Sequence, residues 1–247
     1  MCGLTGYLNL DGAPASPEVL RRMLAIQRHR GPDDRGMRMF SVVSQSTREV
    51  SSGTPEREGG GDYEGALGFN RLAILDLSSN GHQPMCNATG DIFIAYNGEV
   101  YNAFDFRDEL EAAGFAFRSR TDTEVLLYLY ERYGIDEMLE RLNGMFAFCI
   151  VDLRKGQLLL ARDHLGIKPL YYAIQNGTFL FSSEVKSFLV HPRFEARVSE
   201  EDLDEHLAFR YCAGDRFLLK DVRQLRPGHY LRLGRGESSP QVTRYWE

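Results

Sequence analysis

The sequence lacks the features that mark nucleic-acid-binding and membrane proteins. Its 29 Lys and Arg residues are outnumbered by 35 Asp and Glu residues, and the formal net charge is −6. Because no stretch of the chain is markedly basic, neither a nucleic acid nor a membrane surface is an expected partner. No segment is long and apolar enough to span a bilayer, and the first twenty residues are unlike a signal peptide. We therefore expect a cytoplasmic protein that acts on a small molecule or on another protein.

Cysteine is scarce, and its spacing is uninformative for metals and disulfides. The four residues, Cys2, Cys86, Cys149 and Cys212, show no CxxC pattern, which argues against a zinc site and a disulfide scaffold. Cys149 lies in the apolar run GMFAFCIVDL, where a thiol usually packs as a small apolar side chain. Cys86 and Cys212 lie in loop-like segments without an activating neighbour. Cys2 directly follows the initiator methionine, so it is either a packing residue or a catalytic N-terminus once the methionine is removed.

Short apolar segments and a few helices follow one another with little linker, which favours one layered α/β or α+β domain with large antiparallel sheets. A helix is predicted from residue 17 to 29, with Ser16 as its N-cap and Pro17 in its first turn. Further helices are predicted over 102–114, 122–134 and 199–211, and strands over 4–10, 65–77, 91–101, 144–153, 156–163, 168–175 and 178–184. The polar run 44–65 predicts a surface loop or hairpin insertion. The run VRQLRPGHYLRLG predicts a hairpin.

Polar residues interrupt this apolar pattern at four places, in RHRGPDDRG, NRLAILDLS, YNGEVYN and RTDTE. Each place also has an ordinary structural explanation. Asp122 or Thr121 is a plausible helix cap, and Asn97-Gly98 is the commonest hairpin-turn pair. Arg71 alone fits a surface cation or an ion pair at the edge of the core. Taken singly, these residues favour structural roles.

Taken together, the motifs point to one family. MCG, HRGPD, RLAILDLS, QPM, YNGEVYN, TDTE, GMFAF, ARDHLGIKPLYY and SSEVKSFL occur in this order. The set resembles the glutaminase domain of class II glutamine amidotransferases, specifically the asparagine synthetase branch, over essentially the entire chain. The resemblance implies one domain over residues 2–247, with the α+β fold of the N-terminal nucleophile hydrolases. This is a four-layered αββα sandwich with two antiparallel sheets between helical layers.

The resemblance also implies the chemistry of glutamine hydrolysis. Removal of Met1 would free an α-amine on Cys2, and such an amine titrates near ~8, so its neutral form can serve as a base. The thiolate would attack the side-chain amide of L-glutamine, release ammonia and form a thioester that water hydrolyses to glutamate. The Asn97 amide and the Gly98 N–H would form the oxyanion hole.

The same resemblance assigns a set of glutamine-binding residues. Arg71 would bind the α-carboxylate through its guanidinium fork, and Asp122 and Glu99 would bind the α-ammonium group. Ile74 and Leu75 would contribute backbone contacts only. The chain departs from the family in Phe69-Asn70, which precede the RL pair, and in the length of the run 44–65. Neither departure affects a residue assigned to the chemistry.

The sequence contains neither an SGGxDS-type loop nor a GxxxxGK[ST] loop for binding ATP. We therefore expect no cofactor and no metal in this chain, and expect ATP and magnesium only in a synthetase domain or subunit that receives the ammonia. A fragment of a longer synthetase and a stand-alone subunit both fit, and a homodimer stays open. Two other functions also stay open, a glutaminase serving sugar or natural-product amidation and a non-catalytic binding domain that keeps the fold.

Overall fold

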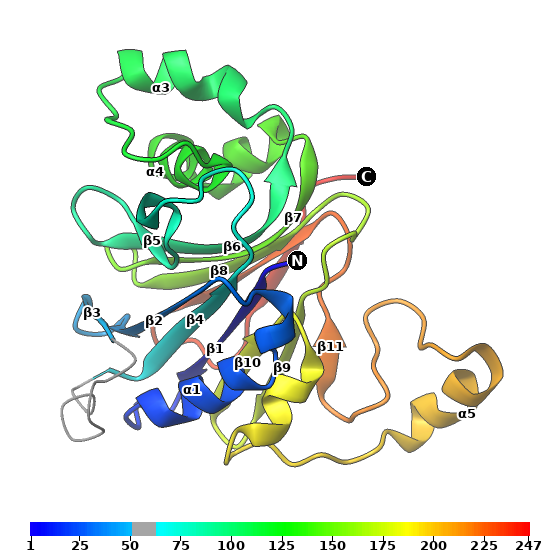
Figure 1. Ribbon diagram of the computed structural model, residues 1–247. Helices are drawn as coiled ribbons and strands as arrows, with labels where there is room; N and C mark the ends of the chain where they lie inside the picture. Colours follow the sequence, from blue (N-terminus) through cyan, green and yellow to red (C-terminus); the bar gives the residue numbers. More distant parts are fainter. Residues whose placement is uncertain (51–62) are drawn as a thin grey trace.

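The computed structural model describes residues 1–50 and 63–247, and in these two antiparallel sheets stack face to face (Figure 1). One sheet contains β1 (Gly3–Asn9), β2 (Asp34–Ser41), β3 (Ser46–Glu49), β4 (Gly65–Arg71), β9 (Tyr171–Gln175), β10 (Thr178–Ser182) and β11 (Val222–Gln224), in the order β11-β9-β10-β1-β4-β2-β3. The other contains β5 (Met85–Cys86), β6 (Ile92–Val100), β7 (Gly144–Asp152), β8 (Gln157–Arg162), β12 (His229–Gly234) and β13 (Gln241–Arg244), in the order β13-β12-β8-β7-β6-β5.

Helices cover the outer face of each sheet. The seven-stranded sheet carries α1 (Pro17–Ala25) and the 3-10 helices η1 (Arg28–Arg30) and η4 (Val185–Val190). The six-stranded sheet carries η3 (Ala103–Phe106), α3 (Arg107–Ala112) and α4 (Asp122–Arg141), and η2 (Ser79–Gly81) lies in the loop after β4. The predicted α+β fold with two sheets between helical layers is confirmed.

Three apolar clusters hold these layers together. Leu4, Phe69, Phe93 and Cys149 belong to the cluster between the two sheets, and the other two clusters lie under α1 and under α4. All seven residues of β1 are buried, because one face of the strand meets the second sheet and the other meets α1. A strand buried on both faces loses the alternation of polar and apolar residues. This explains the continuous apolar character of LTGYLNL.

The helix starts follow the predicted capping pattern. The Ser16 hydroxyl accepts a hydrogen bond from the backbone N–H of Val19, and Pro17 opens α1. Thr121, not Asp122, is the N-cap of α4. The predicted end of that helix at Gly134 is wrong, because Gly134 adopts a φ of 78° and the helix resumes beyond this kink to Arg141. Glycine tolerates this left-handed conformation without steric cost, so a break need not be an end.

The structure also corrects three predictions about strands. β6 runs unbroken through Asn97 and Gly98, which lie opposite Ala147 and Phe146 of β7, so this pair forms no turn. A Cβ on Gly98 would lie 2.4 Å from the carbonyl oxygen of Met145, so the close approach of β7 requires glycine. β11 and β12 belong to different sheets and form no hairpin. The first strand predicted after residue 64 ends at Arg71, well short of residue 77.

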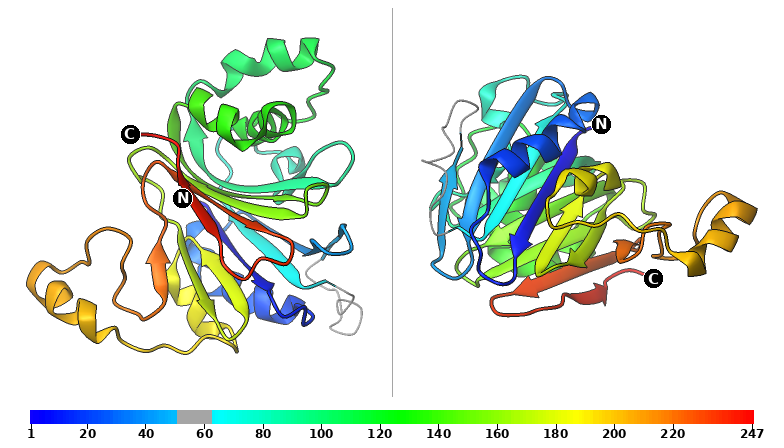
Figure 2. Two further views of the ribbon diagram at one scale, coloured as in Figure 1. Left: turned by 180° about the vertical axis from the view of Figure 1, so that it is seen from behind. Right: turned by 90° about the horizontal axis from the view of Figure 1, so that it is seen from below.

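The rest of the chain bears on the insertion and on the periphery. Within the predicted insertion 44–65, Ser46–Glu49 form β3 against β2, and residues 51–62 lie outside the described residues. α5 (Glu200–Phe209) and its flanking segments project from the two-sheet body (Figures 1 and 2). None of the helices in the described residues is long and apolar enough to cross a membrane.

Replacing the buried thiol of Cys149 tests its predicted packing role. The side chain is fully buried between the sheets, so Cys149→Ser would place a hydroxyl in an apolar site. We expect the free energy of unfolding, measured by urea titration, to fall by about 1–3 kcal/mol. Cys212→Ser, at a partly buried position after α5, is the matched control and should change it by less than about 0.5 kcal/mol. An equal effect at both positions would contradict the packing role.

Candidate active site

Cys2 lies at the N-terminal end of β1, beside the C-terminal end of β4. Gly3 pairs with Asn70, and this register brings the Cys2 Sγ within 3.3 Å of the backbone nitrogen of Leu72. Burial raises the pKa of the Cys2 thiol, while the Leu72 N–H, the N-terminal ammonium and the guanidinium groups of Arg71 and Arg30 oppose that rise. Burial outweighs these positively polarised groups, so the pKa stays raised and formation of the thiolate calls for a nearby base.

Asn97 lies two residues beyond Ala95 on β6, so its side chain is on the face of the second sheet that meets the first sheet. Cys2 packs against the cluster between the sheets, to which Ala95 of β6 belongs. Asn97 is buried, and its Nδ2 has no hydrogen-bond partner among the described residues. A buried donor without an acceptor normally costs about 1–3 kcal/mol, so such groups are rare unless they have a function. An amide nitrogen kept unpaired in this way suits an oxyanion hole.

Asp122 faces β6 from the start of α4. Its Oδ2 accepts hydrogen bonds from the Tyr96 hydroxyl at 2.6 Å and from the Val100 N–H at 3.1 Å. Burial raises the pKa of Asp122, and the bond from Tyr96 opposes this. Burial and the negative charges of Asp122, Glu99 and Cys2 raise the pKa of Tyr96 well above its usual value. Of the three groups, Asp122 contacts the Tyr96 hydroxyl directly, and Glu99 and Cys2 act on it through their charge.

Glu99 is only partly buried. Its carboxylate forms no hydrogen bond with any of the described residues. Burial and the carboxylate of Asp122 raise the pKa of Glu99, and the positive charge of Lys168 opposes the rise. Because the charge of Asp122 disfavours ionisation of Glu99, a nearby cation such as an α-ammonium group would stabilise both carboxylates.

Arg71 is buried at the end of β4, and its guanidinium organises the following loop. Nη1 donates to the carbonyl of Ser78 at 3.0 Å, and Nη2 donates to the carbonyl of Asp76. A guanidinium has five N–H donors, so these two bonds leave donors for a carboxylate. Ile74 and Leu75 lie in this loop and are 67% and 42% exposed. Their contact with glutamine through backbone groups stays a prediction.

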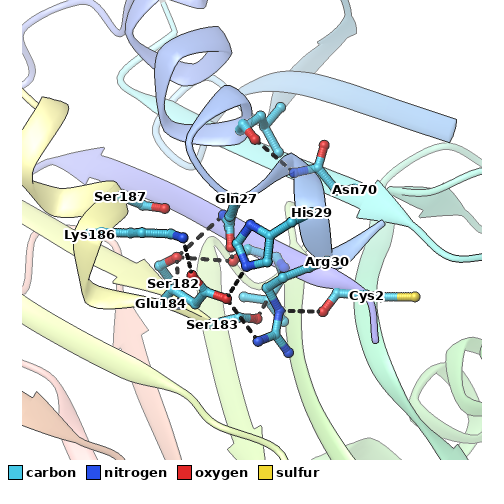
Figure 3. A network of polar contacts seen from close by, with 12 residues as sticks. Cys2, Gln27, His29, Arg30, Asn70, Ser182, Ser183, Glu184, Lys186 and Ser187 are labelled. Carbon is cyan, nitrogen blue, oxygen red and sulfur yellow. Dashed lines mark hydrogen bonds and ion pairs between the residues drawn. The ribbon is translucent and has the colours of Figure 1, made fainter. Parts of the chain in front are cut away.

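Sequence reasoning missed three residues of this region, Arg30, Glu184 and Lys168. Arg30 donates from Nε to the carbonyl oxygen of Cys2 at 2.9 Å and from Nη1 to Glu184 Oε1 at 3.0 Å (Figure 3). Lys168 is buried and affects the pKa of Glu99. Arg30 and Lys168 lie within HRGPD and ARDHLGIKPLYY, and Glu184 within SSEVKSFL. These motifs carried the family resemblance, but nothing in them indicated contact with the site.

The described residues contain no group of three or more His, Cys, Asp or Glu side chains placed to hold a metal ion.

Comparison with known proteins identifies the family. A family model described as "Glutamine amidotransferase domain" matches residues 42–246. The chain belongs to this family. The matched range begins after Cys2, but similarity to individual relatives covers all of this chain. Asparagine synthetase [glutamine-hydrolyzing] 3 of Bacillus subtilis is 34% identical over 250 residues, and putative asparagine synthetase [glutamine-hydrolyzing] 2 of Methanocaldococcus jannaschii is 31% identical over 263 residues.

The resemblance to the asparagine synthetase branch of the glutamine amidotransferases is thereby confirmed. The chain spans 36% of the length of the B. subtilis relative and 47% of that of the M. jannaschii relative. Among solved structures, glutamine phosphoribosylpyrophosphate amidotransferase from B. subtilis matches 99% of this chain and 49% of its own with a TM-score of 0.74. At 21% identity this match shows the shared amidotransferase fold.

Lowering the pH should weaken glutamine binding through Asp122. The pKa of a free Asp is ~3.9. The pKa of Asp122 is raised, so this carboxylate takes up a proton at a higher pH than a free Asp does. The neutral acid is a poor ligand for an ammonium group. We expect the KM for glutamine, measured in steady-state assays of ammonia release, to rise as the pH falls from 7 towards the ordinary Asp pKa of ~3.9.

Two variants separate the candidate ligands in this experiment. Asp122→Asn should show a high KM already at pH 7, with little further rise at lower pH. Glu99→Gln keeps Asp122 and should retain the pH-dependent rise. A wild-type KM that is constant over this range would contradict an ammonium-binding role for Asp122.

Proposed function

We propose that this amidotransferase domain hydrolyses L-glutamine to glutamate and ammonia, with Cys2 as its N-terminal nucleophile. The observation that carries the proposal is the arrangement of two groups from different sheets. The Cys2 sulfur lies against the Leu72 N–H at the end of β4, and the buried Asn97 Nδ2 on β6 has no acceptor among the described residues. A thiol and a buried donor carried by the facing sides of two packed sheets suit acyl transfer.

The first step needs a base for the Cys2 thiol. In the chain that begins with Met1 the nitrogen of Cys2 is an amide, which is not basic. Removal of Met1, whose side chain is exposed, converts this nitrogen into an amine whose neutral form takes the thiol proton. The thiolate then attacks the side-chain carbonyl carbon of glutamine. The C=O electron pair moves to oxygen, where Asn97 Nδ2 and the Gly98 N–H would stabilise the negative charge.

Collapse of this tetrahedral intermediate expels ammonia, which leaves with a proton from the α-ammonium group of Cys2. Water, deprotonated by the same amine, then attacks the thioester and releases glutamate. One terminal residue therefore serves as nucleophile and as general acid and base. Arg71 would bind the substrate α-carboxylate, and Asp122 and Glu99 its α-ammonium group. This set of charges selects an α-amino acid over a simple amide.

We further propose that the ammonia is passed to an asparagine synthetase-type domain or subunit. Support comes from the relatives named asparagine synthetase, which are two to three times as long as this chain. ATP and magnesium would be bound in that partner. Three further features stay predictions: a single domain over residues 2–247, a cytoplasmic location and a homodimer. A different ammonia acceptor would leave the chemistry at Cys2 unchanged.

Substitution of Asn97 tests the proposed activity at its least ordinary feature. Asn97→Ala removes the unpaired buried donor without adding bulk, so kcat for ammonia release from glutamine should fall about 100- to 1000-fold. KM should change little, because the oxyanion exists only after attack. Cys2→Ala, which lacks the nucleophile, sets the background rate. If Asn97→Ala retains a kcat within tenfold of the wild type, Asn97 is not the oxyanion donor. If Cys2→Ala remains active, the proposed function is wrong.

A further inference from the structure

Glu184, which comes from a distant part of the sequence, contacts the side chains of His29, Arg30 and Lys186. It lies between β10 and η4, and its Oε1 is 2.9 Å from His29 Nε2 and 3.0 Å from Arg30 Nη1. The Lys186 Nζ lies 2.9 Å from its other oxygen. Burial opposes ionisation, but the bonds from Lys186, Arg30 and His29 lower the pKa of Glu184. The carboxylate is therefore a stable anion at neutral pH.

Arg30 connects this anion to the nucleophile. Its side chain is only 8% exposed, whereas that of Glu184 is 22% exposed. Its Nε donates to the carbonyl oxygen of Cys2, and its Nη1 donates to Glu184 (Figure 3). The guanidinium is planar and rigid, so fixing one of these nitrogens fixes the direction of the other. A buried guanidinium without a counter-ion is strongly destabilising, and Glu184 is the anion that pairs with Arg30.

Cys2 needs such an anchor because it lies outside β1, which begins at Gly3. Once Met1 is removed, Cys2 is attached to the chain by a single peptide bond. Tilting of the planar Cys2–Gly3 peptide would then move both the amine and the thiol. The bond from Arg30 to the carbonyl oxygen of Cys2 holds the plane of the Cys2–Gly3 peptide, and so fixes the position of the Cys2 Cα that carries both groups. A misplacement of about 1 Å in a reacting group can cost about 100-fold in rate.

We propose that Glu184 is a positioning residue for the nucleophile, which holds the Arg30 guanidinium in the orientation that fixes the Cys2 backbone. The proposal rests on the proposed function of Cys2. It assigns Glu184 no contact with substrate, so its loss should affect the chemical step and leave glutamine binding intact. A carboxylate that merely ties the η4 segment to η1 would affect the free energy of unfolding and leave kcat unchanged.

The first test is Glu184→Gln, which keeps the shape of the side chain and removes its charge. We expect kcat for glutamine hydrolysis to fall about 10- to 100-fold, with KM within about threefold of the wild type. Glu18→Gln is the matched control, because Glu18 pairs with Arg21 at 3.0 Å on α1 and has no link to Cys2; it should retain full kcat. Melting temperatures of both variants are compared. If Glu184→Gln does not fold, Glu184→Asp, which keeps the charge on a shorter side chain, should show the same loss of kcat.

A double-mutant cycle tests whether Glu184 acts through Arg30. Arg30→Lys keeps a positive charge but lacks the rigid fork, so it should lose at least as much kcat as Glu184→Gln. Adding Glu184→Gln to Arg30→Lys should cost less than about a further twofold, because residues in one network are not additive. An unchanged kcat in Glu184→Gln, or losses that multiply in the double variant, would overturn the positioning role. An inactive wild-type protein would instead overturn the proposed function itself.

Discussion

The antiparallel pairing of β1 with β4 is the constraint on which the candidate site depends. The pairing of Gly3 with Asn70 brings the residue before β1 to the end of β4, where the Leu72 N–H contacts the Cys2 sulfur. A chain terminus is normally the least ordered part of a domain. Here the first strand is central in its sheet and buried on both faces. The core therefore holds the strand to which Cys2 is attached, and the bond from Arg30 holds Cys2 itself.

Stacking of the second sheet on the first then supplies the remaining polar groups. β6 brings the unpaired Nδ2 of Asn97 into the buried region, and the start of α4 adds Asp122 behind Tyr96. Such groups destabilise the folded state, because burial disfavours the charge of Asp122, and the Asn97 Nδ2 has no acceptor in the part of the chain that the structure describes. The large apolar clusters on either side of each sheet offset this cost. The apolar clusters thus supply the stability of the sandwich, and the polar groups near Cys2 supply its proposed reactivity.

Residues with a local signature could be predicted from the sequence, and residues with a purely spatial role could not. Ser16 and Pro17 mark the start of α1, and apolar runs mark the central strands. Asn97-Gly98 misled because its turn preference is local, whereas pairing with β7 decides its conformation. The roles of Cys2, Asn97 and Asp122 were predicted from the family resemblance of several motifs in a fixed order. The spacing of these residues alone did not indicate the roles. The Arg30–Glu184 pair joins positions 154 residues apart, so no short sequence pattern could reveal it.

Intact mass spectrometry before and after incubation with 6-diazo-5-oxo-norleucine tests the central claim most directly. The reagent resembles glutamine and alkylates a nucleophile that lies in a glutamine-binding site. The account predicts a chain that lacks the mass of Met1 and gains one adduct, which peptide mapping assigns to Cys2. An adduct on Cys86, Cys149 or Cys212, or a processed chain that gains no adduct, would contradict an N-terminal glutamine-reading nucleophile.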